Sequence, residues 1–198
     1  MEQLLCFLTF ISVFVDLGIC KSNETFFYFA YGSNLLSKRI HINNPSAVYY
    51  SPAKLENHRL DFNFFVEAWN GAVSTIVEDD TEEVWGVLWT LNIDQMKYLD
   101  DQEGVTLGWY FPKNVTVTTP DGKQILARTY QETMTPEKLN KCEDLPVERR
   151  PSSTYLEVIA LGAIESHLPA DYIAFIFSFP SNAQMATAKR RNELGYPF

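Results

Sequence analysis

The amino-acid sequence predicts a single domain that mixes α-helices and β-strands. About six stretches have the composition of strands, and helical segments lie between and after them without the regular alternation of a doubly wound parallel sheet. The chain has 198 residues, of which 46% are apolar and 14% aromatic. This length supports one well-buried core and is too short for two full domains. We therefore expect one mixed α+β domain over residues 21–198.

The first predicted strand is the aromatic run at residues 26–31, which ends abruptly in a small polar turn. A short apolar run bounded by a turn is typical of a strand buried on both faces. Gly32 permits close backbone approach, and Ser33 or Asn34 can cap the helix predicted by the apolar spacing of residues 35–40. This geometry directs several backbone N–H groups at one small volume, which suits a carboxylate or a phosphate. Many such junctions bind nothing, so the stretch alone does not assign a site.

The middle of the chain is predicted to be β-structure. Alternating or β-branched apolar residues indicate strands that are separated by turns at 44–46 and 69–71 and by an acidic loop at 78–83. One predicted strand starts at residues 47–50 and continues through 53–65, and two more cover residues 72–77 and 84–89. The last of these, with its run of valine, leucine and tryptophan, has the composition of a central strand.

A short helix over residues 93–99 is predicted to run into an acidic segment that Gly104 terminates. Glu103 then stands at a helix C-terminus among acidic neighbours, which is an unfavourable place for a negative charge. Two interpretations are open. Glu103 belongs to a solvated surface turn, or its carboxyl pKa is raised and it serves as a proton shuttle.

The second half of the chain begins with two more predicted strands, at 109–118 and 124–130, joined by a Pro-Asp-Gly turn. Residues 132–151 are polar, charged and interrupted by three prolines, which predicts a long surface loop. Two helices are expected after it, over residues 153–164 and 170–179.

Residues 1–20 read as a secretory signal peptide. The apolar stretch from Leu4 to Val15 is short for a membrane span, and small residues at Gly18 and Cys20 suit signal peptidase. The stretch has no Lys or Arg before it, so a short uncleaved anchor is the alternative. We expect an extracellular protein with no stable membrane association after cleavage. Two N-glycosylation sequons, at Asn23 and Asn114, agree with an extracellular location.

The number of cysteines excludes a secreted domain that is cross-linked by internal disulfides. Cys6 and Cys20 fall within the predicted signal peptide, so Cys142 is the one cysteine expected in the mature chain. It is buried, exposed and free, or paired to a second chain. A homodimer is therefore an option that the sequence leaves open.

Charge and motifs exclude several classes of function. The net charge of −9 argues against a nucleic-acid partner, and the one basic run, at 189–191, is expected to be a solvated face. His41, His58 and His167 are scattered without metal-ligand spacing, so we expect no metal site. The sequence has no nucleophile elbow, Walker loop or dinucleotide fingerprint. No cofactor is expected.

Five segments, read together, resemble the γ-glutamylcyclotransferase family. They occur in the order and approximate spacing of that family, and they are Phe29–Leu35, Asn44–Ala47, Val84–Val87, Asp101–Val105 and Gly108–Tyr110. The resemblance covers residues 26–172. It implies a single domain built on a small, strongly curved β-barrel with helices packed around it.

The resemblance also implies a reaction and a site. Family members convert a γ-glutamyl-amino acid to 5-oxoproline and a free amino acid without a metal or cofactor. The family's catalytic glutamate matches Glu103, and its substrate-binding loop matches Tyr31, Gly32, Ser33, Asn34 and Leu35. Tyr110 and Tyr155 fall where family tyrosines approach the substrate, and Tyr130 is a third candidate. For each tyrosine the alternative is core packing with a satisfied hydroxyl.

The chain departs from the family pattern at Asp101, where a glutamate is usual, in the length of the 132–151 segment, and in its predicted export. Two alternatives to the cyclotransferase hypothesis therefore remain. One is a secreted binding protein that keeps the fold but does no catalysis. The other is a cyclotransferase with a different leaving group, acting on γ-glutamylamines or on glutathione.

Overall fold

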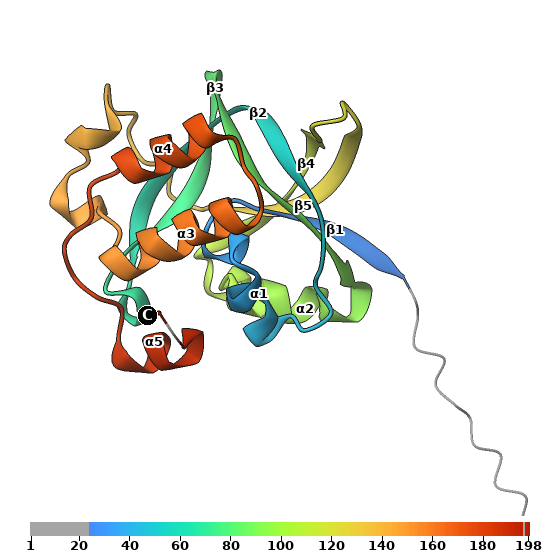
Figure 1. The fold of residues 1–198 in the computed structure, drawn as a ribbon, viewed down its shortest axis with the longest axis horizontal. Helices are drawn as coiled ribbons and strands as arrows, with labels where there is room; N and C mark the ends of the chain where they lie inside the picture. The colour runs from blue at the N-terminus through green and yellow to red at the C-terminus, as the bar shows by residue number, and fades with distance from the viewer. Residues whose placement is uncertain (1–23, 196) are drawn as a thin grey trace, which may run out of the picture.

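Five strands close into one barrel in the order β1-β3-β2-β4-β5 (Figure 1). The structure is a computed structural model that describes residues 24–195 and 197–198. β1 is antiparallel to β3 and parallel to β5, so the first strand completes the barrel. The predicted barrel with surrounding helices is confirmed. The strands are β1 Thr25–Ala30, β2 Val48–Val66, β3 Gly71–Asn92, β4 Tyr110–Thr118 and β5 Gln124–Glu132.

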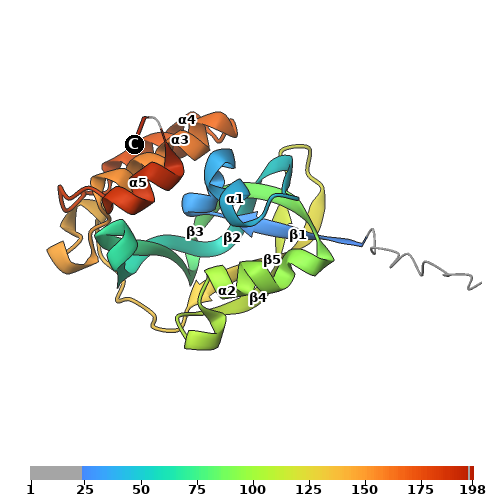
Figure 2. The ribbon, with the colours of Figure 1, turned by 90° about the horizontal axis from the view of Figure 1, so that it is seen from below.

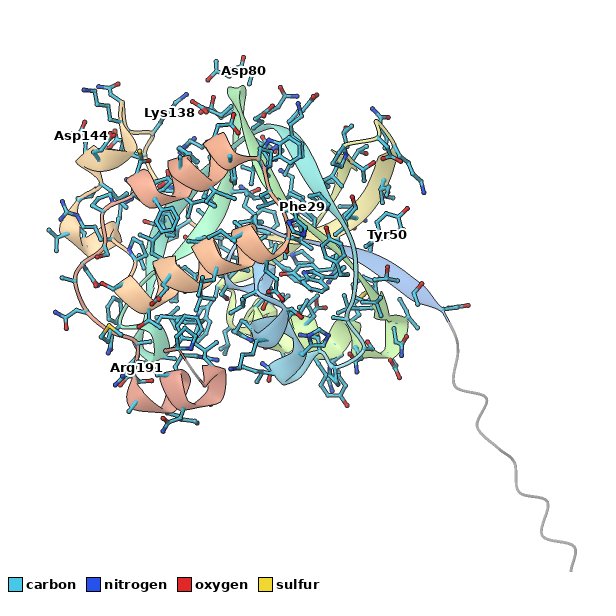
Figure 3. The ribbon with its side chains drawn as sticks, in the orientation of Figure 1. Phe29, Tyr50, Asp80, Lys138, Asp144 and Arg191 are labelled. Carbon is cyan, nitrogen blue, oxygen red and sulfur yellow. The ribbon has the colours of Figure 1, made fainter. Side chains whose placement is uncertain are left out.

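β2 and β3 are continuous strands of 19 and 22 residues. The prediction that the second strand continues through residues 53–65 is confirmed, whereas the predicted acidic loop at 78–83 between two separate strands is wrong. Three register shifts interrupt their ladder, and at the largest of them residues 79–82 have no partner opposite Asn57. Such irregularities bend a strand without ending it. The acidic segment is therefore an outward bend of β3 rather than a loop between strands, and Asp80 lies at the outer end of this bend (Figure 3).

Five α-helices surround the barrel in the described part of the chain. Figure 2 shows α3, α4 and α5 gathered on one side, with α1 and α2 elsewhere on the barrel surface. The helix expected over residues 35–40 forms as a 3-10 turn at Ser33–Leu35 followed by α1. The last helix, α5, is not predicted from the sequence. The helices are α1 Ser37–Asn43, α2 Met96–Gln102, α3 Ser153–Glu165, α4 Ala170–Ser178 and α5 Ala188–Leu194.

The core joins the barrel interior to the inner face of α3. Phe29 of β1 is fully buried at the centre of the molecule (Figure 3), and Ile159 of α3 is equally buried. Gly162 lets α3 approach the backbone after β1, because a Cβ there would lie 2.4 Å from the nitrogen of Leu36. This close packing fixes the position of residues 31–36 against the barrel.

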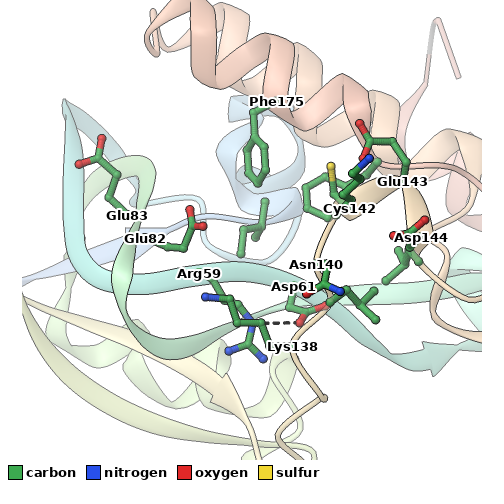
Figure 4. Close-up of a pocket in the computed structure, with 15 residues that line it drawn as sticks. Arg59, Asp61, Glu82, Glu83, Lys138, Asn140, Cys142, Glu143, Asp144 and Phe175 are labelled. Carbon is green, nitrogen blue, oxygen red and sulfur yellow. Dashed lines mark hydrogen bonds and ion pairs between the residues drawn. The ribbon is translucent and has the colours of Figure 1, made fainter.

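Residues 132–151 include two short 3-10 turns, Cys142–Asp144 and Val147–Arg149, and lie largely on the surface. Leu145 is buried, and Arg149 forms an ion pair with Asp61 of β2 at 2.5 Å. Part of the segment lines a cavity of about 670 Å³, and α4 lines another side of this cavity (Figure 4). This cavity shares no lining residue with the site described below.

Cys142 is half-buried, with its Sγ 3.0 Å from the hydroxyl of Ser178, and it forms no disulfide with another described residue. Within residues 24–195 and 197–198, no helix is long and apolar enough to cross a membrane.

Candidate active site

A small polar cavity of about 40 Å³ lies where the segment after β1 meets β3, β4 and α3. Its lining comes from parts of the chain that are far apart in sequence. The residues are Tyr31, Gly32, Ser33, Asn34, Ser74, Glu103, Tyr110 and Tyr155. Every one of these is predicted from the sequence except Ser74, a small polar residue on β3 that lies in none of the five family-like segments.

Leu35 does not reach the cavity, so the structure does not support its predicted substrate contact. Its side chain is fully buried in the core, and its backbone N–H donates to the carbonyl of Gly32 at 2.9 Å. Leu35 therefore closes the 3-10 turn and holds residues 32–34 in place from behind.

Gly32 is required by the tight packing of the cavity wall. A Cβ at this position would lie 2.3 Å from Oγ of Ser74 and 3.2 Å from the hydroxyl of Tyr155. Among the described residues, no acceptor pairs with the backbone N–H groups of Gly32, Ser33 and Asn34. Because protein interiors rarely leave N–H groups without a partner, these three donors are available to a ligand or to water.

Glu103 follows the last residue of α2 and precedes Gly104, whose φ of +65° ends the helix as predicted. Its Oε1 accepts hydrogen bonds from Nδ2 of Asn34 at 3.3 Å and from Nε2 of Gln102 at 3.2 Å. Burial raises the carboxyl pKa of Glu103, against the opposing effect of the nearby Arg39 guanidinium. The carboxyl group therefore faces the cavity in a partly desolvated setting rather than standing on a solvated turn.

Arg39 and Gln102 support Glu103 from outside the small cavity. Arg39 is only 4% exposed, and its Nη1 donates to Oε1 of Gln102 at 3.3 Å. Asn43 also donates to this Oε1, at 3.0 Å. Gln102 thus turns its amide N–H towards Glu103. Neither residue is predicted from the sequence to have a role, although Gln102 lies inside the family-like segment Asp101–Val105.

The tyrosines divide into two groups. The hydroxyls of Tyr110 and Tyr155 both engage Ser74, since Tyr110 donates to its carbonyl at 2.7 Å and Tyr155 lies 3.0 Å from its Oγ. Burial raises the pKa of both phenols. Tyr130 does not line the cavity: its hydroxyl donates to Asp100 at 2.5 Å, and its ring packs in the core. Core packing is therefore the correct interpretation for Tyr130.

The hydroxyl of Tyr31 donates to the carbonyl of Tyr130 at 2.5 Å. Tyr31 lines the cavity, but this bond already uses its one O–H donor. The residue therefore shapes the cavity wall and ties the loop after β1 to β5.

A larger cleft of about 550 Å³ continues from the cavity, because the two share Ser33, Glu103, Tyr110 and Tyr155 as lining residues. Its walls are mostly aromatic or aliphatic and come from residues 64–69 and from Trp109. Arg190 of α5 also lines it. The prediction that residues 189–191 form a solvated face is therefore wrong at Arg190, whose side chain is 17% exposed and stacks 4.9 Å from the ring centroid of Trp69.

Comparisons with known proteins identify the family. The profile of the AIG2-like family matches residues 83–176. The gamma-glutamylcyclotransferase of Bos taurus is 46% identical over 156 residues, which is 77% of each chain. That of Homo sapiens is 41% identical over 153 residues, which is 75% of this chain and 76% of the human protein. The chain belongs to the gamma-glutamylcyclotransferase family.

A solved structure of a gamma-glutamyl cyclotransferase agrees with this assignment. It superposes with a TM-score of 0.76 at 35% identity, covering 86% of this chain and 98% of that chain. The barrel and the helices around it therefore form a gamma-glutamylcyclotransferase fold.

Within the described residues of this family member, no group of three or more His, Cys, Asp or Glu side chains is arranged to hold a metal ion. Of the two predicted glycosylation sites, Asn114 is exposed on β4. Asn23 and the predicted signal peptide at 1–20 lie outside the described residues.

Proposed function

We propose that this protein cyclises γ-glutamyl-amino acids to 5-oxoproline and releases the free amino acid. The observation that supports the proposal most strongly is the position of Glu103, hydrogen-bonded to Asn34 in a cavity with unpaired loop amides. Relatives that carry the name of this activity are 41% to 46% identical.

The reaction is an internal acyl transfer. The α-amine of the glutamyl group attacks its own γ-carbonyl carbon, a C–N bond forms, and the amide C–N bond to the departing amino acid breaks. The nucleophile is tethered to the carbonyl, so ring closure avoids the entropic cost of bringing two molecules together. The protein must fold the glutamyl chain back on itself and transfer protons: the α-nitrogen loses two on becoming the ring amide, and the departing nitrogen gains two on leaving as an ammonium group.

Glu103 relays these protons one at a time. As a carboxylate it accepts a first proton from the α-ammonium group, which frees the lone pair for attack, and it then protonates the departing amide nitrogen. The second proton, lost from the ring nitrogen once the new C–N bond has formed, is taken up by the released amine. Burial raises the carboxyl pKa of Glu103, so its protonated form is easier to reach than that of a carboxyl group in water, and this favours the proton transfer. The loop amides of Gly32, Ser33 and Asn34 stabilise the negative charge that develops on the carbonyl oxygen.

Glu103→Gln tests the assignment, because the amide keeps the size of the side chain and cannot accept the proton. We expect release of 5-oxoproline from γ-glutamyl-alanine to fall by about 10²- to 10⁴-fold. Asp101→Asn, two residues away and exposed, is the matched control and should retain activity. If the wild-type protein binds γ-glutamyl-alanine but releases no 5-oxoproline, it is a binding protein on the same fold.

The departing group distinguishes this activity from that of related cyclotransferases. A panel of γ-glutamyl-alanine, a γ-glutamylamine and intact glutathione, measured side by side, separates the possibilities. We expect the amino-acid derivative to be turned over with the highest kcat/KM. A preference for glutathione or for the amine would replace the proposed substrate.

We further propose that the protein is exported and glycosylated. The apolar segment at residues 4–15, the two sequons and the exposed position of Asn114 support this proposal. Expression of the full chain in a secreting eukaryotic cell should place it in the medium, with a mass that endoglycosidase lowers. Asn114→Gln should reduce that mass change. Retention of an unglycosylated chain inside the cell would reject the proposal.

A further inference from the structure

Two arginines line the 550 Å³ cleft that continues from the cavity of Glu103. Arg39 belongs to α1 and Arg190 to α5, at opposite ends of the chain. The proposed catalytic step uses neither of them directly.

Arg39 is buried without a carboxylate partner within ion-pair distance among the described residues. Its Nη1 contacts the neutral amide of Gln102, and its Nε is buried with no hydrogen-bond partner. A buried guanidinium normally has its donors satisfied, so an unpaired Nε beside a cleft indicates a missing acceptor.

Two neighbouring side chains, Trp69 and Glu193, fix the position of the Arg190 side chain. Its guanidinium stacks on Trp69, and its Nη1 pairs with Glu193 at 3.1 Å on the same helix. Its Nε, like that of Arg39, is buried and unpartnered. The contacts with Trp69 and Glu193 fix the side chain while leaving a donor free, which is the arrangement of a preorganised binding group.

The two positive charges act on each other. The charge of Arg190 lowers the pKa of Arg39, in addition to the larger effect of burial. Like charges near one another in a partly buried cleft are unfavourable unless negative charge balances them. Glu103, which also lines the cleft, balances part of this charge and raises the pKa of Arg39. Glu67 lines the cleft too but is exposed, and neither carboxylate makes an ion pair with either arginine in the described structure.

We propose that Arg190, together with Arg39, binds the α-carboxylate of the departing amino acid and so selects γ-glutamyl-amino acids over γ-glutamylamines. This inference rests on the proposed function, since the glutamyl group must occupy the small cavity for its leaving group to extend into the cleft. A leaving group of amino-acid size fits in 550 Å³, and aromatic walls suit an apolar side chain.

The first test compares γ-glutamyl-alanine with γ-glutamyl-ethylamine, which lacks only the leaving-group carboxylate. We expect the wild-type protein to prefer the acid in kcat/KM by about tenfold to hundredfold, because hydrogen bonds between charged groups are worth more than neutral ones. Arg190→Gln should reduce this ratio towards one by raising KM for the acid. Arg190→Lys should keep part of the ratio, and Lys189→Gln, an exposed neighbour on α5, should keep all of it.

The second test does not depend on turnover. Calorimetry with the Glu103→Gln protein should show tighter binding of γ-glutamyl-alanine than of γ-glutamyl-ethylamine, and adding Arg190→Gln should remove the difference. Equal binding of the two compounds, or a difference that survives loss of Arg190, would overturn the subsite even if the wild-type protein is active. An inactive wild-type protein that still shows the Arg190-dependent difference would reject the catalytic function alone.

Discussion

Asn34 donates a hydrogen bond from Nδ2 to Oε1 of Glu103 at 3.3 Å, across 69 positions of the sequence. The same Nδ2 lies 3.0 Å from the hydroxyl of Tyr28, and the backbone carbonyl of Asn34 accepts from Trp89 at 3.0 Å. Hydrogen bonds therefore fix both the side-chain amide and the backbone carbonyl of Asn34. It presents one donor to the carboxyl group that the proposed reaction uses.

Asn34→Ala should change the pH dependence of the enzyme. Glu103 accepts a proton only when ionised, so kcat/KM falls as pH drops below its pKa, which burial already raises above 4.5. Removing a donor to the ionised form raises that pKa further. The acid limb of the pH profile should move to higher pH by about half a unit to one unit, consistent with a weak charged hydrogen bond.

Asn140→Ala is the control for this experiment, because Asn140 is exposed in the 132–151 segment and lines neither the cavity of Glu103 nor the adjoining cleft. Its acid limb should stay at the wild-type position. A limb that moves to lower pH in Asn34→Ala would show that this bond does not stabilise the carboxylate.

Gly32→Ala should distort the cavity, because its Cβ would meet Oγ of Ser74 at 2.3 Å. Overpacking of this kind costs about 1–3 kcal/mol. Ser74→Ala removes the clashing atom, so the double variant should recover part of the lost stability, measured by urea unfolding of all four proteins. Ser74→Ala alone loses the contact with Tyr155. If the stability losses of the two single variants simply add in the double variant, neighbouring residues move to relieve the clash, and the cavity wall is less rigid than its geometry indicates.

Local patterns in the sequence predict much of the fold. The aromatic run before Gly32, the strands flanking the Pro-Asp-Gly turn and the helix that Gly104 ends are all found in the structure. Each depends on residues that are close in sequence. Only the resemblance to the family predicts the barrel itself, because the composition of the strands does not determine which strands pair.

Long-range packing explains what the sequence did not predict. The acidic residues at 78–83 have the composition of a loop, but pairing with β2 on both sides keeps them within one bent strand. Arg190 belongs to a basic run typical of a solvated helix, and only the stacking on Trp69 brings it into the cleft. Leu35 sits in a substrate-loop motif, yet the close approach of α3 turns it into the core.

Glu132→Gln should alter how stability depends on pH. Glu132 is 2% exposed, and burial raises its pKa from 4.5 to about 7. The folded state therefore binds a proton more tightly than the unfolded state, so this group's contribution is fully present below pH 4.5 and is lost as pH rises to about 7. The shift corresponds to about 3 kcal/mol. The variant should lack this loss and be more stable than wild type at pH 8.

Urea unfolding of both proteins at pH 5 and pH 8 measures this effect. The gain at pH 8 should be smaller than the full value, since an amide at 132 places one donor near Asn63, which donates to the present carboxylate at 3.2 Å. Glu157→Gln, exposed on α3, controls for simple removal of a charge. An identical stability difference at the two pH values would mean that Glu132 titrates normally.

Arg149→Met should loosen residues 132–151 without harming catalysis. Arg149 pairs with Asp61 at 2.5 Å, and the two side chains are 12% and 7% exposed. Removing one partner leaves a buried charge, although Arg59 still contacts Asp61 at 3.3 Å, so we expect a loss of about 1–3 kcal/mol in urea unfolding. Adding Asp61→Asn should restore part of it. The kcat/KM should stay near the wild-type value because the cavity beside this segment shares no lining residue with that of Glu103. A large fall in kcat/KM with little loss of stability would instead couple the 132–151 segment to the active site.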